Sequence, residues 1–325
     1  MTRLMLHAGT HKTGTTALQS TLARIRPQLA DRNILYPDFS SQLGGASRAH
    51  HQFVSTVVHP ATGRERAREV RGILDEQISG GRETQVLLSS EAVYRHVRSR
   101  YEWRQLPAEE FWPLHLEYLQ ALALLLHGME IEVLLVLRRP DAFAVSLYSE
   151  FVMNGVDVPP FEDWLPSAAP MLDYDRQIVC FTQAFNQVTT VRYEDLCAGG
   201  LEESFLRLVG VEGVNVPRRG RTRQSAEVRV LLWMREQRLG AASERHSFVR
   251  SRIYRELLDT DELVRSLWSS TDARNDFLAS LDGDHGASYW PAPTDEIVPA
   301  LLDEATSTRI AEGWLRWKQG GGLPE

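Results

Sequence analysis

The apolar run Leu4-Met5-Leu6, followed by Gly9 and then by Lys12-Thr13-Gly14-Thr15-Thr16-Ala17-Leu18, is the part of this chain that decides its fold. The run predicts a buried strand, the glycines predict a loop, and a helix is expected to begin at about Thr15. Such a junction directs backbone N–H groups and a helix N-terminus at one point, which makes an anion-binding site. The lysine adds a positive charge and the threonines add hydroxyl donors. We therefore expect a phosphate-like ligand with at least two negative charges.

The lysine of this segment is displaced from its usual place in phosphate-binding loops. Gly9 and Gly14 have the spacing of the general loop G-x-x-x-x-G-K-[ST], but Thr15 follows Gly14 where that motif has lysine. Lys12 instead lies two positions before Gly14 and approaches the anion from the loop. This displacement disfavours ordinary ATP or GTP hydrolysis. A strand–glycine–helix junction can also be a tight turn without a ligand, but a lysine and three threonines in one turn favour the anion site.

Composition places the chain among ordinary soluble globular proteins. It has 325 residues, of which 43% are hydrophobic and 24% charged, enough for one large α/β domain or two small ones. The net charge of −7 and the isoelectric point of about 5.9 argue against a general nucleic-acid binder and against a basic membrane-surface protein. We expect neither nucleic acid nor a membrane surface as a partner.

Features of the chain's termini, apolar segments and cysteines predict a cytoplasmic protein. Met1-Thr2-Arg3 leads directly into the first strand, which leaves no room for a signal peptide. The most apolar stretch, Leu119–Leu137, is interrupted by charged residues and a glycine, so it predicts a helix end, a turn and a buried strand in place of a membrane span. Cys180 and Cys197 are too few for a disulfide framework. No cluster with metal-ligand spacing appears.

Four apolar runs predict buried parallel strands, each followed by a helical pattern. The expected strands are Arg3–His7, Gln85–Ser89, Ile131–Leu137 and Val188–Arg192. The fold class we predict is α/β: a P-loop-like, three-layer α/β/α arrangement with a central parallel sheet of about five strands and a mainly helical C-terminal part. Ligands of such sheets bind beyond the carboxyl ends of the strands.

Helical patterns fill most of the remaining chain. After a loop at Ser40–Ser47, helices are expected at about His50–Val58 and Arg64–Ile78. Four more are expected after the last strand, at Ala226–Leu239, Phe248–Leu258, Glu262–Leu281 and Asp295–Trp317. The chain has no internal repeat and no low-complexity linker. We therefore expect a single domain over residues 1–325, with residues 226–325 as its helical C-terminal extension.

A second candidate anion site follows the third predicted strand. Arg138 stands at the end of this strand, Pro140 suits the first turn of a helix, and Ser146 comes eight residues after Arg138. Ser146 is thus expected about two turns into that helix, where it and the arginine would hold a second phosphate. Alternatively, Ser146 faces solvent, as most helix serines do, and Arg138 has only a structural role.

Together, the two elements resemble the sulfotransferases that use 3′-phosphoadenosine 5′-phosphosulfate (PAPS). In that family a K-x-G-T-T loop holds the 5′-phosphosulfate, and an arginine with a serine eight residues later holds the 3′-phosphate. Lys12-Thr13-Gly14-Thr15-Thr16 and Arg138…Ser146 match both elements in order and spacing. Ile34-Leu35-Tyr36-Pro37 is similar to a stretch of the bacterial branch, and Arg192-Tyr193-Glu194-Asp195-Leu196 to a common family segment. The resemblance covers roughly residues 3–239.

The resemblance implies in-line sulfuryl transfer from PAPS, without a required metal, to a hydroxyl or amine of a glycan, lipid or small-molecule acceptor. Lys12 would stabilise the leaving phosphate, and the following loop residues would bind the phosphosulfate. Tyr193 would lie near the adenine, unless it is a core residue. Arg219 and Gly220 would cover the 3′-phosphate, unless their basic loop is only a solvated turn.

The general base is expected to be Glu91, because carbohydrate sulfotransferases of this superfamily place a glutamate near the end of this strand. Partial burial would raise the pKa of its carboxyl group toward a useful value. The alternative is a helix cap, since Ser89, Ser90 and Glu91 precede a short apolar run. His50 or His51 is the second candidate base, because the cytosolic animal enzymes use histidine.

Other features leave alternatives open. Many family members have proline where this chain has His11, so the roles of His7 and His11 are undetermined. A small-molecule kinase and a non-catalytic nucleotide-binding protein of the same fold remain competing functions. Four aromatic residues would form a sugar-binding face if they are not core residues: Tyr101, Trp103, Trp112 and Tyr118. Neither the acceptor nor the oligomeric state can be predicted.

Overall fold

The computed structural model describes residues 2–11, 13–40, 49–98, 106–154, 159 and 161–214. Of these, residues 2–143 and 167–214 belong to one compact unit, which contains the sheet, and residues 144–166 belong to a second. The helices predicted after residue 225 lie outside the described residues. The single domain over the whole chain therefore stays a prediction.

The central sheet has five strands, all parallel, in the order β2-β3-β1-β4-β5. The strands are β1 (Arg3–Gly9), β2 (Ile34–Leu35), β3 (Gln85–Ser89), β4 (Glu130–Leu137) and β5 (Gln187–Arg192). The predicted α/β fold class is confirmed, and the four predicted strands lie within one or two residues of their expected bounds. The two-residue edge strand β2 was not predicted, because it is too short to give a periodic signal.

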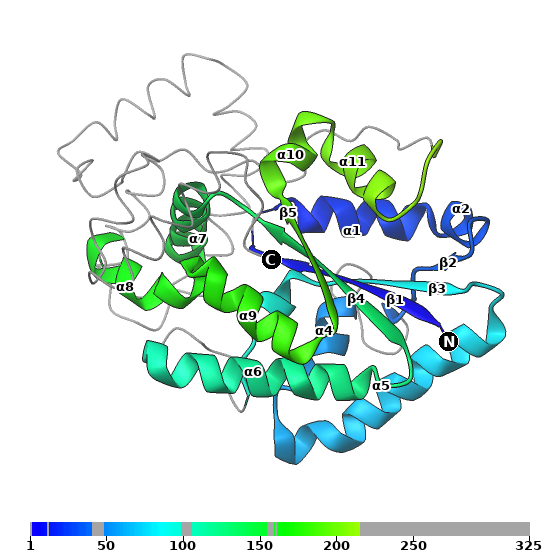
Figure 1. Cartoon of the computed structure of the whole chain (residues 1–325), viewed down its shortest axis with the longest axis horizontal. Helices are drawn as coiled ribbons and strands as arrows, with labels where there is room; N and C mark the ends of the chain where they lie inside the picture. The colour runs from blue at the N-terminus through cyan, green and yellow to red at the C-terminus, as the bar shows by residue number, and fades with distance from the viewer. Residues whose placement is uncertain are drawn as a thin grey trace, which may run out of the picture. The chain divides into compact units, whose positions relative to one another are not determined.

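Helices cover both faces of the sheet and make three layers (Figure 1). On one face lie α1 (Thr15–Arg24), α2 (Arg26–Ala30), α10 (Tyr193–Ala198) and α11 (Leu201–Leu208). The other face carries α4 (Ala49–Ser55), α5 (Pro60–Gly80), α6 (Ala108–Leu125) and α9 (Tyr174–Ala184). The remaining helices are the short 3₁₀ helix η1 (Glu91–Tyr94), α7 (Pro140–Asn154) and α8 (Phe161–Leu172).

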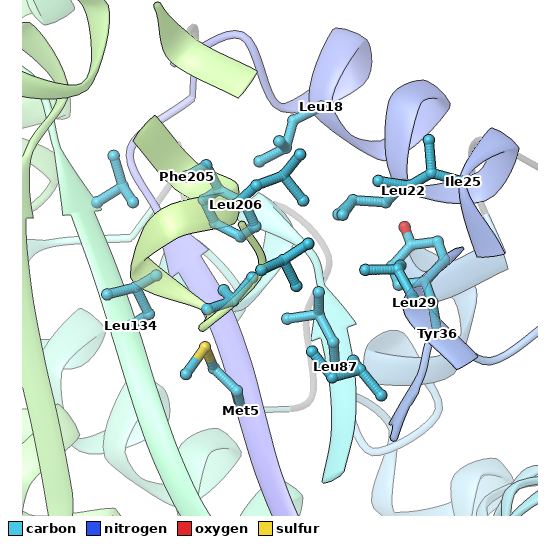
Figure 2. Packing of buried hydrophobic residues seen from close by; sticks show 14 of the residues in the cluster. Met5, Leu18, Leu22, Ile25, Leu29, Tyr36, Leu87, Leu134, Phe205 and Leu206 are labelled. Atoms are coloured by element: carbon cyan, nitrogen blue, oxygen red, sulfur yellow. The ribbon is translucent and has the colours of Figure 1, made fainter. Parts of the chain in front are cut away.

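An apolar cluster attaches α1 and α11 to the sheet (Figure 2). Leu18 and Leu22 of α1 pack with Phe205 of α11 over Met5 and Leu134 of the strands. All five side chains are at least nine-tenths buried. Burial of a leucine or phenylalanine side chain stabilises a fold by about 1.5–3 kcal/mol. The helix that follows the loop from Gly9 to Gly14 is therefore fixed to the sheet by its apolar face.

The opposite face of the sheet buries aromatic residues that hold its helices together. The Tyr118 hydroxyl of α6 donates to the Val54 carbonyl of α4 at 3.1 Å. Tyr118 is fully buried and belongs to the core, so it cannot contribute to the sugar-binding face considered above. Trp112 packs under the guanidinium of Arg176, whose central carbon is 5.4 Å from the ring centroid. Tyr101 and Trp103 lie outside the described residues.

The apolar stretch at residues 119–137 contains the predicted helix end, turn and strand. Helix α6 ends at Leu125, a turn follows, and β4 begins at Glu130. Within the described ranges, no helix combines the length and the apolar character that crossing a bilayer requires.

The strand order decides which loops become neighbours. Strand β1 lies between β3 and β4, with His7 opposite Ser89 and Gly9 opposite Val136. The carboxyl ends of these three strands therefore meet at one edge of the sheet. The loop after β1 has Ser90 and Glu91 on one side and Arg138 on the other.

Candidate active site

The loop between β1 and α1 is built around two glycines that no other residue replaces without strain. Gly9 has a φ of +150° and Gly14 a φ of +69°. A Cβ atom at Gly9 would overlap the backbone of Val136 in β4, and one at Gly14 would overlap the Leu201 side chain of α11. The loop backbone therefore passes directly against both neighbours, which fixes its position at the sheet edge.

The N-terminus of α1 has no cap from its own N-cap side chain. Gly14 is the N-cap residue, in the left-handed conformation, and no acidic residue stands in the first turn. The N–H groups and the positive dipole end of this helix are thus available to an external anion. Buried hydroxyl groups stabilise the loop: the Thr13 hydroxyl donates to the Thr10 carbonyl at 2.9 Å and lies 3.2 Å from the Thr15 hydroxyl. Thr16, the next residue, is half-buried.

Hydrogen bonds join this loop to the end of β4. The Thr10 N–H donates to the Val136 carbonyl at 2.9 Å, and the Arg138 N–H donates to the Thr10 hydroxyl at 3.0 Å. Thr10 is completely buried, so both bonds are shielded from water. The arginine predicted to bind a second phosphate is therefore held at a fixed place beside the anion loop.

Two tyrosines position Arg138 further. Its carbonyl accepts a hydrogen bond from the Tyr174 hydroxyl, and its guanidinium lies over the Tyr193 ring, 5.6 Å from the centroid. Burial, with the neighbouring Cys197, raises the pKa of Tyr193 to about 12, so the phenol stays neutral. The structure thus places Tyr193 against the predicted phosphate-binding arginine. Its contact with an adenine stays a prediction.

Glu91 forms a pair with His51 on the other side of the loop. Glu91 is the first residue of η1, and its Oε1 lies 3.2 Å from Nε2 of His51 in α4. Nδ1 of the same imidazole lies 2.6 Å from the Ser90 hydroxyl. Ser90 is the N-cap residue of η1 but makes no side-chain cap bond. The Ser90 side chain therefore does not cap η1, whereas Glu91 stands in the first turn of η1 and also pairs with His51.

The expected upward shift of the Glu91 pKa is wrong. Burial alone would raise it, but the hydrogen bond from His51 and the nearby imidazoles of His11 and His51 outweigh burial and lower the pKa to about 2. His11 is itself neutral near pH 7, because burial lowers its pKa well below 6.5. His51, considered above as an alternative base to Glu91, is therefore the residue that lowers the Glu91 pKa most. Glu91 is an ionised, hydrogen-bonded carboxylate at neutral pH.

Gln19, which the sequence analysis did not single out, connects α1 to this carboxylate. Its Nε2 donates to the Ser89 carbonyl at 2.8 Å and lies 3.5 Å from Oε2 of Glu91. Gln19 is buried, five positions after Gly14 on the helix of the anion loop. Nothing in the local sequence marks this glutamine, because its two partners lie 70 and 72 positions away in the chain. Gln19 thus links α1 to the end of β3 and to the Glu91 carboxylate.

Backbone groups engage both ring nitrogens of His50, the second candidate base. Its Nδ1 accepts from the Ser89 N–H at 3.3 Å, so Nε2 carries the proton and donates to the Pro37 carbonyl at 3.1 Å. The ring also stacks on Tyr36, with centroids 4.5 Å apart. Burial lowers its pKa to about 4. Both ring nitrogens are occupied by backbone groups, which gives His50 a structural role.

His7 also has a structural role. It lies in β1 opposite Ser89, and its Nδ1 is 2.8 Å from the Ser89 hydroxyl. Its ring packs against Phe205 of α11, with centroids 4.8 Å apart. Burial lowers its pKa to about 4, so His7 is neutral at pH 7. It serves as a polar link between two core strands.

Several predicted site residues cannot be placed beside these groups. Lys12, Arg219 and Gly220 lie outside the described residues. Ser146 is half-buried on α7, in the second compact unit, so its pairing with Arg138 stays a prediction. What the structure does bring together are the Gly14 loop, Arg138 with Tyr193, and Glu91 with His51.

Comparisons with known proteins add one finding. No family model and no curated protein matches this chain. Among solved structures, the chain is similar to a sulfotransferase from Alicyclobacillus acidocaldarius, at 15% sequence identity and a TM-score of 0.39, over 74% of this chain and 94% of that one. At this level of similarity, the functional argument depends on the residues of the site.

Proposed function

We propose that this protein is a PAPS-dependent sulfotransferase that moves a sulfuryl group to a hydroxyl or amine of a glycan, lipid or small-molecule acceptor. One observation carries the proposal. The strand order sets an ionised carboxylate, Glu91 with His51, on one side of the Gly14 anion loop and Arg138 on the other. Transfer from a donor with two separated anionic groups requires a base, a loop that binds one anionic group and a positive charge that binds the other.

Donor binding is assigned to the loop and to its β4 neighbour. The first N–H groups of α1, with Thr15, Thr16 and Lys12, would bind the phosphosulfate. Arg138 and Ser146 would bind the 3′-phosphate, covered by Arg219 and Gly220, and Tyr193 would support the adenine. The backbone of Arg138 is held by the Thr10 hydroxyl and its guanidinium lies over the Tyr193 ring, so little ordering is needed when the phosphate binds.

In the transfer step, the acceptor oxygen forms a bond to sulfur while the bond between sulfur and the bridging phosphate oxygen breaks. The acceptor proton passes to Glu91, and the electron pair of the broken bond stays on adenosine 3′,5′-bisphosphate. Lys12 would stabilise that charge. The low pKa of Glu91 makes the transfer late, because the acceptor proton becomes acidic only as the new bond forms. His51 would then stabilise the protonated Glu91 carboxyl group through the hydrogen bond between the two side chains.

A P-loop kinase fits these residues less well. Kinase chemistry needs an acidic ligand for Mg²⁺ at a strand end, whereas Arg138 follows β4. The acid after β3, Glu91, has one oxygen paired with His51 and the other near the Gln19 amide. A carboxylate with N–H donors at both oxygens suits proton transfer better than coordination of a hard cation.

Binding calorimetry tests the function. We expect adenosine 3′,5′-bisphosphate to bind without added metal, and ATP with Mg²⁺ to bind weakly or not at all. Arg138→Ala should weaken bisphosphate binding by roughly tenfold or more, since it removes a charged hydrogen-bond donor. Lys12→Ala should abolish transfer from labelled PAPS.

Arg66→Ala is the matched control, because Arg66 pairs with Glu69 on the exposed surface of α5 and should leave both measurements unchanged. Tight binding of ATP–Mg²⁺ without binding of the bisphosphate would exclude the sulfotransferase assignment. Full transfer activity in Lys12→Ala would exclude the proposed mechanism.

A further inference from the structure

His11 has a hydrogen-bonding atom that nothing in the described part of the chain satisfies. Its side chain is buried, with 6% of the residue exposed, and its Nε2 has no hydrogen-bond partner. A buried polar group without a partner typically costs a protein about 1–3 kcal/mol. Such a group therefore requires an explanation, and an absent ligand is one of the few available.

The other buried histidines at this sheet edge make the contrast clear. His7 is hydrogen-bonded to Ser89, and His50 has a backbone partner at each ring nitrogen. Both have structural roles, with burial compensated by hydrogen bonds. His11 is as deeply buried as they are, but its Nε2 lacks this compensation.

The turn that carries His11 is the anion loop itself. Its two ends are closed by the hydrogen bond from the Thr13 hydroxyl to the Thr10 carbonyl, so His11 lies at the tip of the turn, three positions before Gly14. Electrostatic coupling to Glu91, Arg95 and His51 shows that the ring is near η1 and α4. His11 thus belongs to the loop that leads into α1 and lies near the Glu91–His51 pair.

We propose that His11 is a donor-binding residue whose Nε2–H hydrogen-bonds an oxygen of the phosphosulfate at the 5′ end of PAPS. This inference rests on the proposed function. The imidazole is neutral near pH 7 and so has one N–H, and an anionic oxygen is the strongest acceptor for it. His11 belongs to the loop that would bind the phosphate and lies near the carboxylate that would accept the proton. The sulfuryl group must occupy this space during transfer.

His11→Leu separates a ligand-binding role from a packing role. The leucine removes the unpartnered nitrogen while filling similar space, so the thermal midpoint of the ligand-free protein should stay equal or rise. Affinity for PAPS and for adenosine 3′,5′-bisphosphate should be measured by calorimetry. We expect the affinity for PAPS to fall by about tenfold to a hundredfold, the usual effect of losing a hydrogen bond to a charged group.

His11→Gln is the rescue variant, because its amide N–H reaches nearly as far as Nε2 of histidine. It should keep the PAPS affinity within a few-fold of the wild-type value. His50→Leu is the matched control for burial: it leaves two backbone groups unpaired and should lower the thermal midpoint.

The outcomes are distinguishable. Unchanged PAPS affinity in His11→Leu, with or without a lower thermal midpoint, overturns the inference and leaves the proposed function standing. Equal loss of affinity in the Leu and Gln variants overturns the hydrogen bond to Nε2. If wild-type protein binds neither PAPS nor the bisphosphate, the proposed function fails, and this inference fails with it.

Discussion

At the scale of single residues, His50 and His51 show how adjacent identical side chains acquire different roles. The two rings project from neighbouring positions of α4, and each reaches a different part of the β3 end. His50 meets the Ser89 N–H and the Pro37 carbonyl, which specify its tautomer. His51 meets the Ser90 hydroxyl and the Glu91 carboxylate. Because an ionised carboxylate only accepts hydrogen bonds, Nε2 of His51 is the donor in its contact with Glu91.

His51→Leu tests the control of Glu91 by its partner. Removal of the hydrogen bond leaves burial as the main influence, so the pKa of Glu91 should rise from about 2 toward or above its usual value of 4.5. A base acts only when deprotonated. In His51→Leu, kcat/KM for sulfuryl transfer should therefore fall with acid within the pH range in which both proteins stay folded, whereas in the wild type Glu91 stays ionised throughout that range.

Glu91→Gln provides the reference for this measurement. It should lower kcat by about 10²–10⁴-fold while donor binding is retained, as loss of a general base does. The exposed Glu69, replaced in the same way, should have no effect. If the His51→Leu and wild-type profiles superimpose, Glu91 is not the group whose ionisation the reaction requires.

At the scale of elements, the unit formed by β1, the loop and α1 depends on neighbours far away in the chain. Leu201 of α11 packs against Gly14, and Val136 of β4 packs against Gly9. The apolar stripe of α1 contacts Phe205 and Leu206 (Figure 2). These contacts fix the two ends of the loop, and the hydrogen bond from the Thr13 hydroxyl to the Thr10 carbonyl holds its middle.

Gly14→Ala should destabilise the protein for two separable reasons. The left-handed conformation costs an alanine about 1–2 kcal/mol, and the new methyl group also meets the Leu201 side chain. Gly128→Ala is the control: Gly128 has a φ of +85° and nothing within 4 Å of its added Cβ. Urea denaturation should show a larger loss for Gly14→Ala than for Gly128→Ala.

The double variant Gly14→Ala/Leu201→Ala measures the steric part. Because the shortened side chain makes room for the methyl group, the two substitutions should destabilise by less than the sum of their separate effects. Equal losses at Gly14 and Gly128, with strict additivity in the double variant, would show that α11 does not confine the loop.

At the scale of the whole molecule, buried histidines make the fold sensitive to acid. Burial lowers the pKa to about 4 in His7, His50 and His115 and to about 3 in His96. Unfolded histidine titrates near 6.5, so the unfolded chain binds more protons than the folded one between these values. The stability from these neutral side chains is complete above about pH 6.5 and is lost as pH falls toward 4.

The free energy of unfolding should therefore fall by up to about 1.4 kcal/mol per pH unit for each of these histidines. Urea denaturation at several pH values from about 7.5 to about 4.5 measures this pH dependence of the free energy of unfolding. His115→Phe keeps the aromatic packing with Phe111 and should make the slope shallower. A stability that stays constant over this range would contradict the burial of neutral histidines.

Much of the fold was predictable from the sequence, and less of the site. Strands buried on both faces appear as continuous apolar runs, so β1, β3, β4 and β5 were located from their residues alone. The two-residue strand β2 was not, because it is too short for periodicity. Glu91, Arg138 and Gly14 were identified as candidates from their positions at strand ends. Gln19 was missed, since nothing local marks a helix glutamine as facing a distant carboxylate.

The sequence by itself determined the elements: apolar runs make strands, and Gly14 between a strand and a helix makes a tight loop, because these preferences are local. Tertiary structure decided the neighbours. The strand order put Glu91 and Arg138 on opposite sides of the loop, and the packing of α4 against η1 paired Glu91 with His51. That pairing reversed the expected shift of the Glu91 pKa. A pKa depends on groups that are close in space, and closeness between residues 40 positions apart is settled only when the chain has folded.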